Sequence, residues 1–210
     1  MPSPSPTTLV IDTVTAACSV ALLDLEGRVL SEQHEVVGRG HAERLLPMIA
    51  QLLDNRRPDA VLVDCGPGSF TGLRVGLAAA HGLAIGWQVP LAGYSATALL
   101  AVMAEAGNAP LAAALQAGHG EIFVQSFAGD PPEPIDTIRS LRPEQAAAEI
   151  VAETLVGSGA EALAAARGHG RALDLLPRAA EALRLPLALR SLPPRPIYGR
   201  APDARPMSAA

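Results

Sequence analysis

The sequence predicts an α/β protein built as two lobes. Residues 59–64 are an apolar strand-like run, the glycine-rich stretch 66–72 follows, and a helical pattern then continues to Trp87. Three further β-rich runs precede this unit, and the strand pattern begins again after residues 107–110. A chain of 210 residues that is 49% hydrophobic can bury a large core. We therefore divide it into an N-terminal lobe (1–107), a smaller second lobe (108–192) and a Pro- and Arg-rich tail (193–210).

The first lobe begins with three runs that predict an antiparallel meander, at residues 8–12, 18–23 and 28–33. Apolar residues then recur with the i, i+3, i+4, i+7 spacing of an amphipathic helix over residues 41–54. Pro47 lies inside this segment and predicts a kink or a late helix start, because proline cannot donate a backbone hydrogen bond.

The later elements follow from the same local rules. Strands are expected at 89–93, 111–116, 121–127 and 154–157, and helices at 71–87, 95–106, 142–152, 160–166 and 173–185. The tail from residue 193 shows no periodicity and is expected to be extended and partly disordered.

The composition excludes several kinds of chemistry. All 16 basic residues are arginine, so no lysine can form a Schiff base or serve a P-loop. The net charge of −5 and the 3% of aromatic residues argue against strong stand-alone binding to nucleic acid. Cys18 and Cys65 lie far apart and outside any CxxC pattern, which fits a reducing cytoplasm. We see no leader and no membrane-spanning run, and we expect a cytoplasmic protein.

The stretch Gly66-Pro67-Gly68-Ser69 stands between a predicted strand and a predicted helix. Glycines there could aim backbone N–H groups at a phosphate. The stretch is neither a Walker A loop nor a nucleophile elbow, and the pattern favours close helix packing over phosphate binding.

Asp12 and Thr13 end the first predicted strand. A carboxylate at a strand end could orient hydrated magnesium and a terminal phosphate. The alternative, which we favour, is an Asx turn in which Asp12 bonds the backbone of the following residues. Asp64 could approach Asp12 from the neighbouring strand. The five histidines are scattered without HxxxH spacing, so no metal site is expected.

The first two predicted helices carry distinctive patterns of apolar or small residues. On the helix at 41–54, Met48 widens the apolar arc beyond one core-facing stripe. The arc fits either a fully buried helix, slightly favoured, or a helix that partly faces another protein. On the next helix, Gly72, Gly76 and Ala80 form a small-residue stripe that permits close approach of another backbone.

Four segments together resemble the TsaB (YeaZ) family. They are Ile11 to Thr13 with Ala17 to Ala21, Gly38 to Pro47, Gly66 to Arg74 and Pro196 to Ala204. The run Gly-Pro-Gly-Ser-Phe-Thr-Gly-Leu-Arg is highly specific for this family. The tail departs slightly, with Gly199 where members more often carry leucine.

The resemblance implies an actin-like fold, shared with Hsp70 chaperones and sugar kinases, whose second lobe is reduced. It implies a non-catalytic subunit of the complex that forms N6-threonylcarbamoyladenosine at position 37 of ANN-decoding tRNAs. Such a subunit binds and activates the TsaD transferase, lets TsaE join, meets tRNA only through the complex, forms homodimers when alone and needs no cofactor. Where TsaD-like enzymes carry a metal-binding HxxxH pair, residues 94–100 of this chain offer no ligand.

In this family the partner interface is made by the first two helices. The implied interface residues are His41, Leu45, Leu46, Met48, Ile49, Leu52, Gly72, Arg74, Val75, Gly76, Ala79 and Ala80. Asp12, Thr13, Gly66, Gly68 and Ser69 correspond to degenerate phosphate loops. Two alternatives stay open: a stand-alone actin-like ATPase or metallopeptidase, and a purely structural homodimer.

Overall fold

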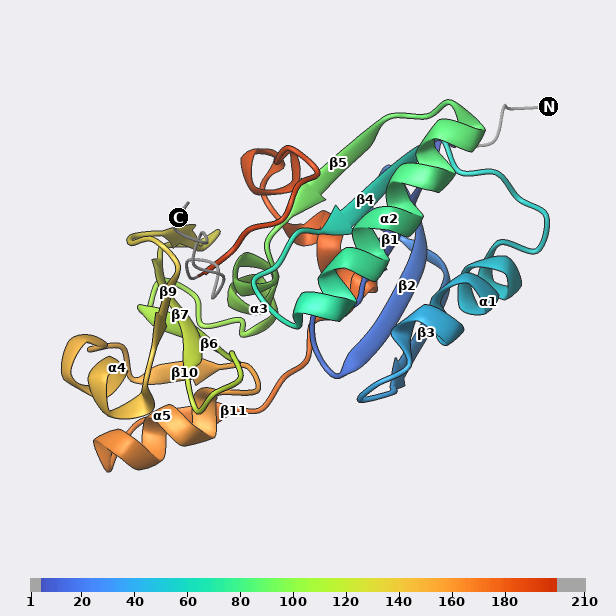
Figure 1. Ribbon diagram of the computed structural model, residues 1–210. Helices are drawn as coiled ribbons and strands as arrows, with labels where there is room; N and C mark the ends of the chain where they lie inside the picture. The colour runs from blue at the N-terminus through green and yellow to red at the C-terminus, as the bar shows by residue number, and fades with distance from the viewer. Residues whose placement is uncertain (1–4, 200–210) are drawn as a thin grey trace, which may run out of the picture.

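The computed structural model describes residues 5–199, which form two mixed β-sheets with helices packed on them (Figure 1). In the first sheet the strand order is β3-β2-β1-β4-β5. Strands β1, β2 and β3 form the antiparallel meander, and β4 and β5 run parallel to β1. The bounds are β1 Thr7–Asp12, β2 Ala17–Asp24, β3 Val29–Val36, β4 Ala60–Asp64 and β5 Leu91–Tyr94.

Helices cover both faces of the first sheet. On one face α1 (His41–Leu53) packs against β2 and β3, and α2 (Phe70–Trp87) packs against β1, β4 and β5 (Figure 1). On the other face a 3-10 helix, η1 (Ala179–Arg184), contacts β1, β2 and β3 and the neighbouring α3 (Ala96–Met103). The apolar core of the first lobe therefore lies on both sides of the sheet.

The second sheet has shorter strands and belongs to the smaller lobe. Its order is β11-β10-β6-β7-β8, and β9 pairs with β7 beside β8. Helices α4 and α5 pack against each other, and α5 also contacts β6, β10 and β11. Its elements are β6 Leu111–Gln116, β7 Ile122–Ala128, β8 Glu133–Pro134, β9 Arg139–Leu141, α4 Pro143–Glu149, β10 Thr154–Val156, α5 Ala160–Arg167 and β11 Arg171–Leu173.

The predicted α/β architecture of two lobes, each with a mixed sheet and flanking helices, is confirmed. Helix α1 begins at His41, so Pro47 does not delay its start. The helix predicted at 173–185 is wrong: Leu173 ends β11, and only η1 forms further along. Pro177 lies between them and has no N–H to donate to a helix ladder.

The chain returns to the first sheet before residue 192, the predicted end of the second lobe. Besides η1, the 3-10 helix η2 (Leu187–Arg190) contacts β5, and Leu192 pairs with Gly93 at its edge. Residues 193–199 of the predicted tail continue along the first lobe and are bonded to it. Residues 200–210 of that tail lie outside the described residues.

The small-residue stripe of α2 faces the chain's own first sheet. A Cβ on Gly72 would collide with the carbonyl oxygen of Thr13, and a Cβ on Gly76 would collide with the Thr13 hydroxyl. That hydroxyl donates a 2.7 Å hydrogen bond to the Gly72 carbonyl, and Ala80 is completely buried. The close approach that the stripe permits is therefore between α2 and the end of β1.

This packing predicts opposite effects for two alanine substitutions on α2. Gly72→Ala should lower the free energy of unfolding by about 1 to 3 kcal/mol, because its methyl group meets a backbone carbonyl. Gly86→Ala should raise it by about 0.4 to 1 kcal/mol, since nothing lies near that position and alanine favours the helix. Urea unfolding of the purified variants measures both. Equal stabilities would contradict the contact with Thr13.

Candidate functional site

Helices α1 and α2 enclose an open apolar groove on the outer surface of the first lobe. The groove has a volume of about 480 Å³. Its side chains are all apolar, and Leu46 at its margin is 53% exposed. The lining residues are Ala42, Leu45, Leu46, Val75, Ala78, Ala79, Gly82 and Leu83. Four of them, Ala42, Ala78, Gly82 and Leu83, are absent from the residues the sequence predicted. Three of the four are small residues, which give no distinctive signal.

The structure separates the twelve predicted interface residues into two groups. The eight that are buried within the chain are His41, Leu45, Met48, Ile49, Leu52, Gly72, Gly76 and Ala80. The four that reach the surface are Leu46, Arg74, Val75 and Ala79. The wide apolar arc of α1 is thus mostly a core face, because α1 lies flat on β2 and β3. Any docking surface on α1 is limited to the margin that carries Leu46.

The loop at Gly66 to Ser69 directs two of its three backbone N–H groups, those of Gly66 and Ser69, at acceptors within the chain. The Gly66 N–H donates to Asp64 Oδ1 at 2.7 Å, and the Ser69 N–H donates to the Val14 carbonyl at 2.7 Å. A Cβ on Gly68 would collide with the same Val14 carbonyl. Ser69 caps α2 by accepting a 3.3 Å hydrogen bond from the Gly72 N–H. The loop is therefore packed tightly against the turn that follows β1.

Asp12 and Asp64 meet at the ends of β1 and β4, completely enclosed by the first lobe. Asp12 and Asp64 share a hydrogen bond, and the Tyr94 hydroxyl donates to Asp12 Oδ2 at 2.9 Å. The backbone of Val14 also lowers the pKa of Asp12, the direction in which the Asx turn that the sequence predicts would act. Tyr94 gave no sequence signal, because only the pairing of β4 with β5 brings it there.

The enclosure changes the protonation of this carboxyl pair. Burial raises the pKa of Asp12 to about 6, even though its hydrogen bonds to Asp64, Tyr94 and Val14 act in the opposite direction. Burial and the charge of Asp12 raise the pKa of Asp64 well above its usual range. We therefore assign the shared proton to Asp64, which donates it to Asp12. A carboxyl pair engaged in this way has no side facing solvent on which to hold hydrated magnesium.

A cleft of about 530 Å³ lies between the two lobes. The turn after β1, the start of α2 and the facing ends of the second sheet border it. Its lining includes the rings of Phe70 and Phe123, the guanidinium side chain of Arg39 and the polar residues Gln116 and Ser158.

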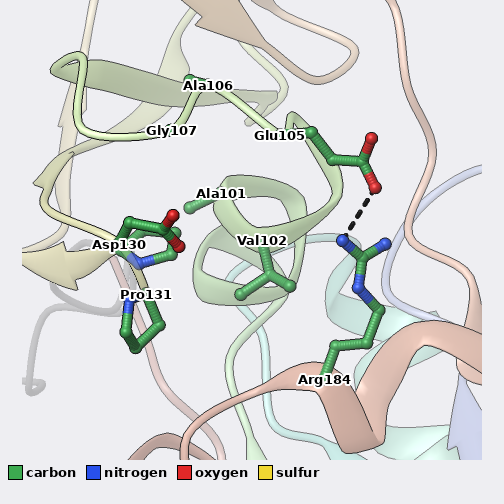
Figure 2. A pocket seen from close by; sticks show the side chains of 9 residues that line it. Ala101, Val102, Glu105, Ala106, Gly107, Asp130, Pro131 and Arg184 are labelled. Atoms are coloured by element: carbon green, nitrogen blue, oxygen red, sulfur yellow. Dashed lines mark hydrogen bonds and ion pairs between the residues drawn. The ribbon is translucent and has the colours of Figure 1, made fainter.

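A second, smaller cavity of about 340 Å³ opens at the end of α3 (Figure 2). Figure 2 shows Arg184 and Glu105 pointing toward each other beside it, with an Nη2 to Oε1 distance of 2.8 Å. Arg184 is also paired with Glu181. Its charge is thus already balanced by two carboxylates.

Between residues 5 and 199, no three His, Cys, Asp or Glu side chains are grouped closely enough to hold a metal ion. No helix in that same range combines the length and the apolar character that a bilayer crossing requires.

The three sequence matches that follow are all named for threonylcarbamoyl modification of tRNA adenosine. The family model described as "TsaD: tRNA N6-adenosine threonylcarbamoyltransferase" matches residues 27–134. A protein of Escherichia coli K12 named "tRNA threonylcarbamoyladenosine biosynthesis protein TsaB" is 37% identical over 129 residues, which are 58% of this chain and 55% of that protein. The protein of the same name from Haemophilus influenzae is 44% identical over 90 residues, covering 40% of this chain and 37% of its own length. The matched region thus spans about half or less of these two relatives.

Solved structures match over nearly the whole chain. A structure described as YeaZ from Pseudomonas aeruginosa is 35% identical, with a TM-score of 0.75 over 92% of this chain and 99% of that chain. Another from the same organism, described as similar to peptidase YeaZ, is 34% identical, with a TM-score of 0.77 over 93% of this chain and 100% of that chain.

The buried carboxyl pair predicts that stability falls as pH rises. The folded-state pKa of Asp12, about 6, lies above its ordinary value of 3.8, so the folded chain binds protons more tightly than the unfolded chain. This contribution to the free energy of unfolding is full below pH 3.8 and is lost as pH rises through 6. Asp64→Asn replaces the shared proton with a permanent N–H donor. It should reduce the decline between about pH 4 and about pH 8 by roughly 1 to 3 kcal/mol.

Urea unfolding at a series of pH values measures this decline. Asp174→Asn is the matched control, because Asp174 is exposed and lies outside the pair. A decline of equal size in the native chain and in Asp64→Asn would contradict the shared proton.

Proposed function

Because the chain belongs to the TsaB (YeaZ) family, we propose that it is a cytoplasmic subunit of the machinery that makes N6-threonylcarbamoyladenosine in tRNA. In this proposal it catalyses no step itself. It binds the TsaD transferase and keeps it in its working state, TsaE joins the pair, and tRNA is met through the complex. The names of its relatives support a role in threonylcarbamoyladenosine biosynthesis. The groove between α1 and α2 supports a role that depends on binding another protein.

The groove between α1 and α2 supports the proposed binding to TsaD. A surface lined entirely by apolar side chains, with the exposed Leu46 at its margin, gains free energy when another apolar surface covers it. Small residues such as Ala78, Ala79 and Gly82 let a helix from a partner approach closely. The same surface can pair with a second copy of the chain, so we expect a homodimer that TsaD displaces.

The buried pair of Asp12 and Asp64 supports the proposal that the chain catalyses no step itself. An acid that orients a metal ion and a phosphate must face the ligand, whereas Asp12 is enclosed and bonded to Tyr94 and Asp64. The glycine loop beside it is likewise directed at acceptors of the same chain. Both features favour a structural role for these loops.

Substitution of Leu46 tests the interface. Leu46→Asp places a charge at the exposed margin of the groove and should weaken binding to TsaD by at least about 30-fold, because a buried interface anchor is worth about 2 kcal/mol or more. Isothermal calorimetry with purified TsaD measures the affinity, and the homodimer should dissociate in sedimentation runs of the same variant. Leu45→Asp is unsuitable, since Leu45 is only 1% exposed and its substitution would disturb the core.

Leu25→Asp is the matched control for this test. Leu25 is 64% exposed on the turn between β2 and β3, away from the groove, so its substitution should leave TsaD affinity unchanged. Undiminished binding by Leu46→Asp, or equal losses in the two variants, would contradict the proposed interface.

The stand-alone ATPase alternative makes a different prediction. If Asp12 and the Gly66 to Ser69 loop still served a nucleotide, ATP with magnesium would bind the isolated chain and be turned over. We expect neither binding heat nor phosphate release, because both groups are bonded within the chain. Micromolar binding with turnover would favour the ATPase.

A further inference from the structure

The segment 192–199, here named the C-terminal clasp, crosses the first lobe beside α2. At its beginning, Leu192 and Gly93 exchange two backbone hydrogen bonds of 3.0 and 2.8 Å at the edge of β5. The Pro194 carbonyl accepts a 3.0 Å hydrogen bond from His81 Nε2 on α2. The clasp is therefore anchored to both β5 and α2 before it reaches the glycine loop.

The middle of the clasp lies on the glycine loop itself. The Ile197 N–H donates a 2.8 Å hydrogen bond to the Cys65 carbonyl. The Ile197 carbonyl oxygen stands 3.1 Å from the point where a Cβ on Gly66 would lie, so the absence of a side chain at Gly66 makes room for the clasp. At Gly66 the φ angle is +95°, a conformation that glycine adopts readily.

The end of the clasp spans from the first lobe to the second. The ring of Tyr198 stacks on Phe70 of α2 with centroids 5.3 Å apart, and the Arg74 guanidinium lies 4.1 Å from the centroid of the same Phe70 ring. The next residue, Gly199, contacts the ring of Phe123 on β7, where any side chain at Gly199 would collide with it. Phe70 and Phe123 are also on opposite borders of the cleft between the lobes.

We propose that the glycine loop is the binding site of the chain's own C-terminal clasp, and that the bound clasp fixes the width of the cleft between the two lobes. The clasp places the Ile197 carbonyl oxygen above Gly66, where its partial negative charge repels an anion, while Gly68 and Ser69 border the cleft. Its contacts on Phe70 in one lobe and Phe123 in the other tie the two borders of the cleft together. The site thus has a built-in peptide ligand, and its occupancy does not depend on nucleotide or phosphate.

Residue-resolved amide hydrogen exchange on the full-length protein tests this inference. The Ile197 amide should be protected in the native chain. Tyr198→Ala should speed its exchange by roughly 2- to 12-fold, the change that corresponds to the loss of one aromatic pair. The Gly93 amide, at the other end of the clasp, should change less. Ile135→Ala is the matched control, because Ile135 is 63% exposed and lies between β8 and β9 of the second lobe.

Gly199→Val gives a second variant, whose side chain displaces the clasp from Phe123 and should speed Ile197 exchange further. An Ile197 amide that exchanges as fast as an unstructured peptide in the native chain, or at one rate in the native chain, Tyr198→Ala and Ile135→Ala, would overturn the clasp. If Gly199→Val fails to fold, the comparison of Tyr198→Ala with Ile135→Ala still decides.

A phosphate titration tests directly whether the glycine loop binds an anion. Inorganic phosphate added to the native protein should leave the amide signals of Gly66 to Ser69 unshifted. Saturable shifts of these signals would contradict the proposal that the clasp occupies the glycine loop. This readout needs no partner protein, so its outcome is independent of whether the chain binds TsaD.

Discussion

The contact between α2 and the end of β1 determines where the rest of the first lobe can lie. With no Cβ at Gly72 and Gly76, the helix axis comes close enough for the Thr13 hydroxyl to bond the Gly72 carbonyl at 2.7 Å. The start of α2 is thereby fixed above the turn that follows β1, which in turn fixes Ser69 as its cap. A larger residue at either glycine would push the helix outward, and the groove with α1 would change shape with it.

The two buried carboxyl groups of the same region depend on each other, because Asp12 Oδ1 and Asp64 Oδ2 have no other hydrogen-bond partner. Burying two carboxyl groups side by side is unfavourable when both are charged, and the raised pKa values of Asp12 and Asp64 express that penalty. Holding one proton between them and accepting the Tyr94 hydroxyl makes the pair compatible with a core. The two acidic residues are therefore enclosed in the interior, at a cost in stability that grows as pH rises through 6.

Local pattern was enough to predict most elements, because their signals are short-range. The meander follows from β-rich runs and turns, and α1 follows from its 3.6-residue period. Pattern could not decide which side of α1 faces outward. Leu45 and Leu46 are adjacent in the same apolar arc, yet one is buried and the other half exposed, because the position of the sheet selects between them.

Of the long-range contacts, the sequence anticipated the approach of Asp64 to Asp12, and most of the others could not be predicted from local pattern. Tyr94 bonds Asp12 from 82 positions away, and η1 folds back onto β2 through Ser19, which accepts a 3.0 Å hydrogen bond from the Ala179 N–H. A run rich in proline, such as the clasp, has no periodicity from which an anchored structure could be inferred. Its order comes entirely from the surfaces on which it lies.

Helix α2 is consequently held on three sides. Thr13 lies beneath it, α1 lies along one flank, and the clasp lies against its first turn and bonds His81 further along. A helix constrained in this way loses little conformational entropy when another protein covers its exposed side chains. The free energy gained by burying apolar surface is therefore offset less by the cost of ordering the helix. The groove is therefore preformed, and the proposed binding of TsaD requires no rearrangement of α2.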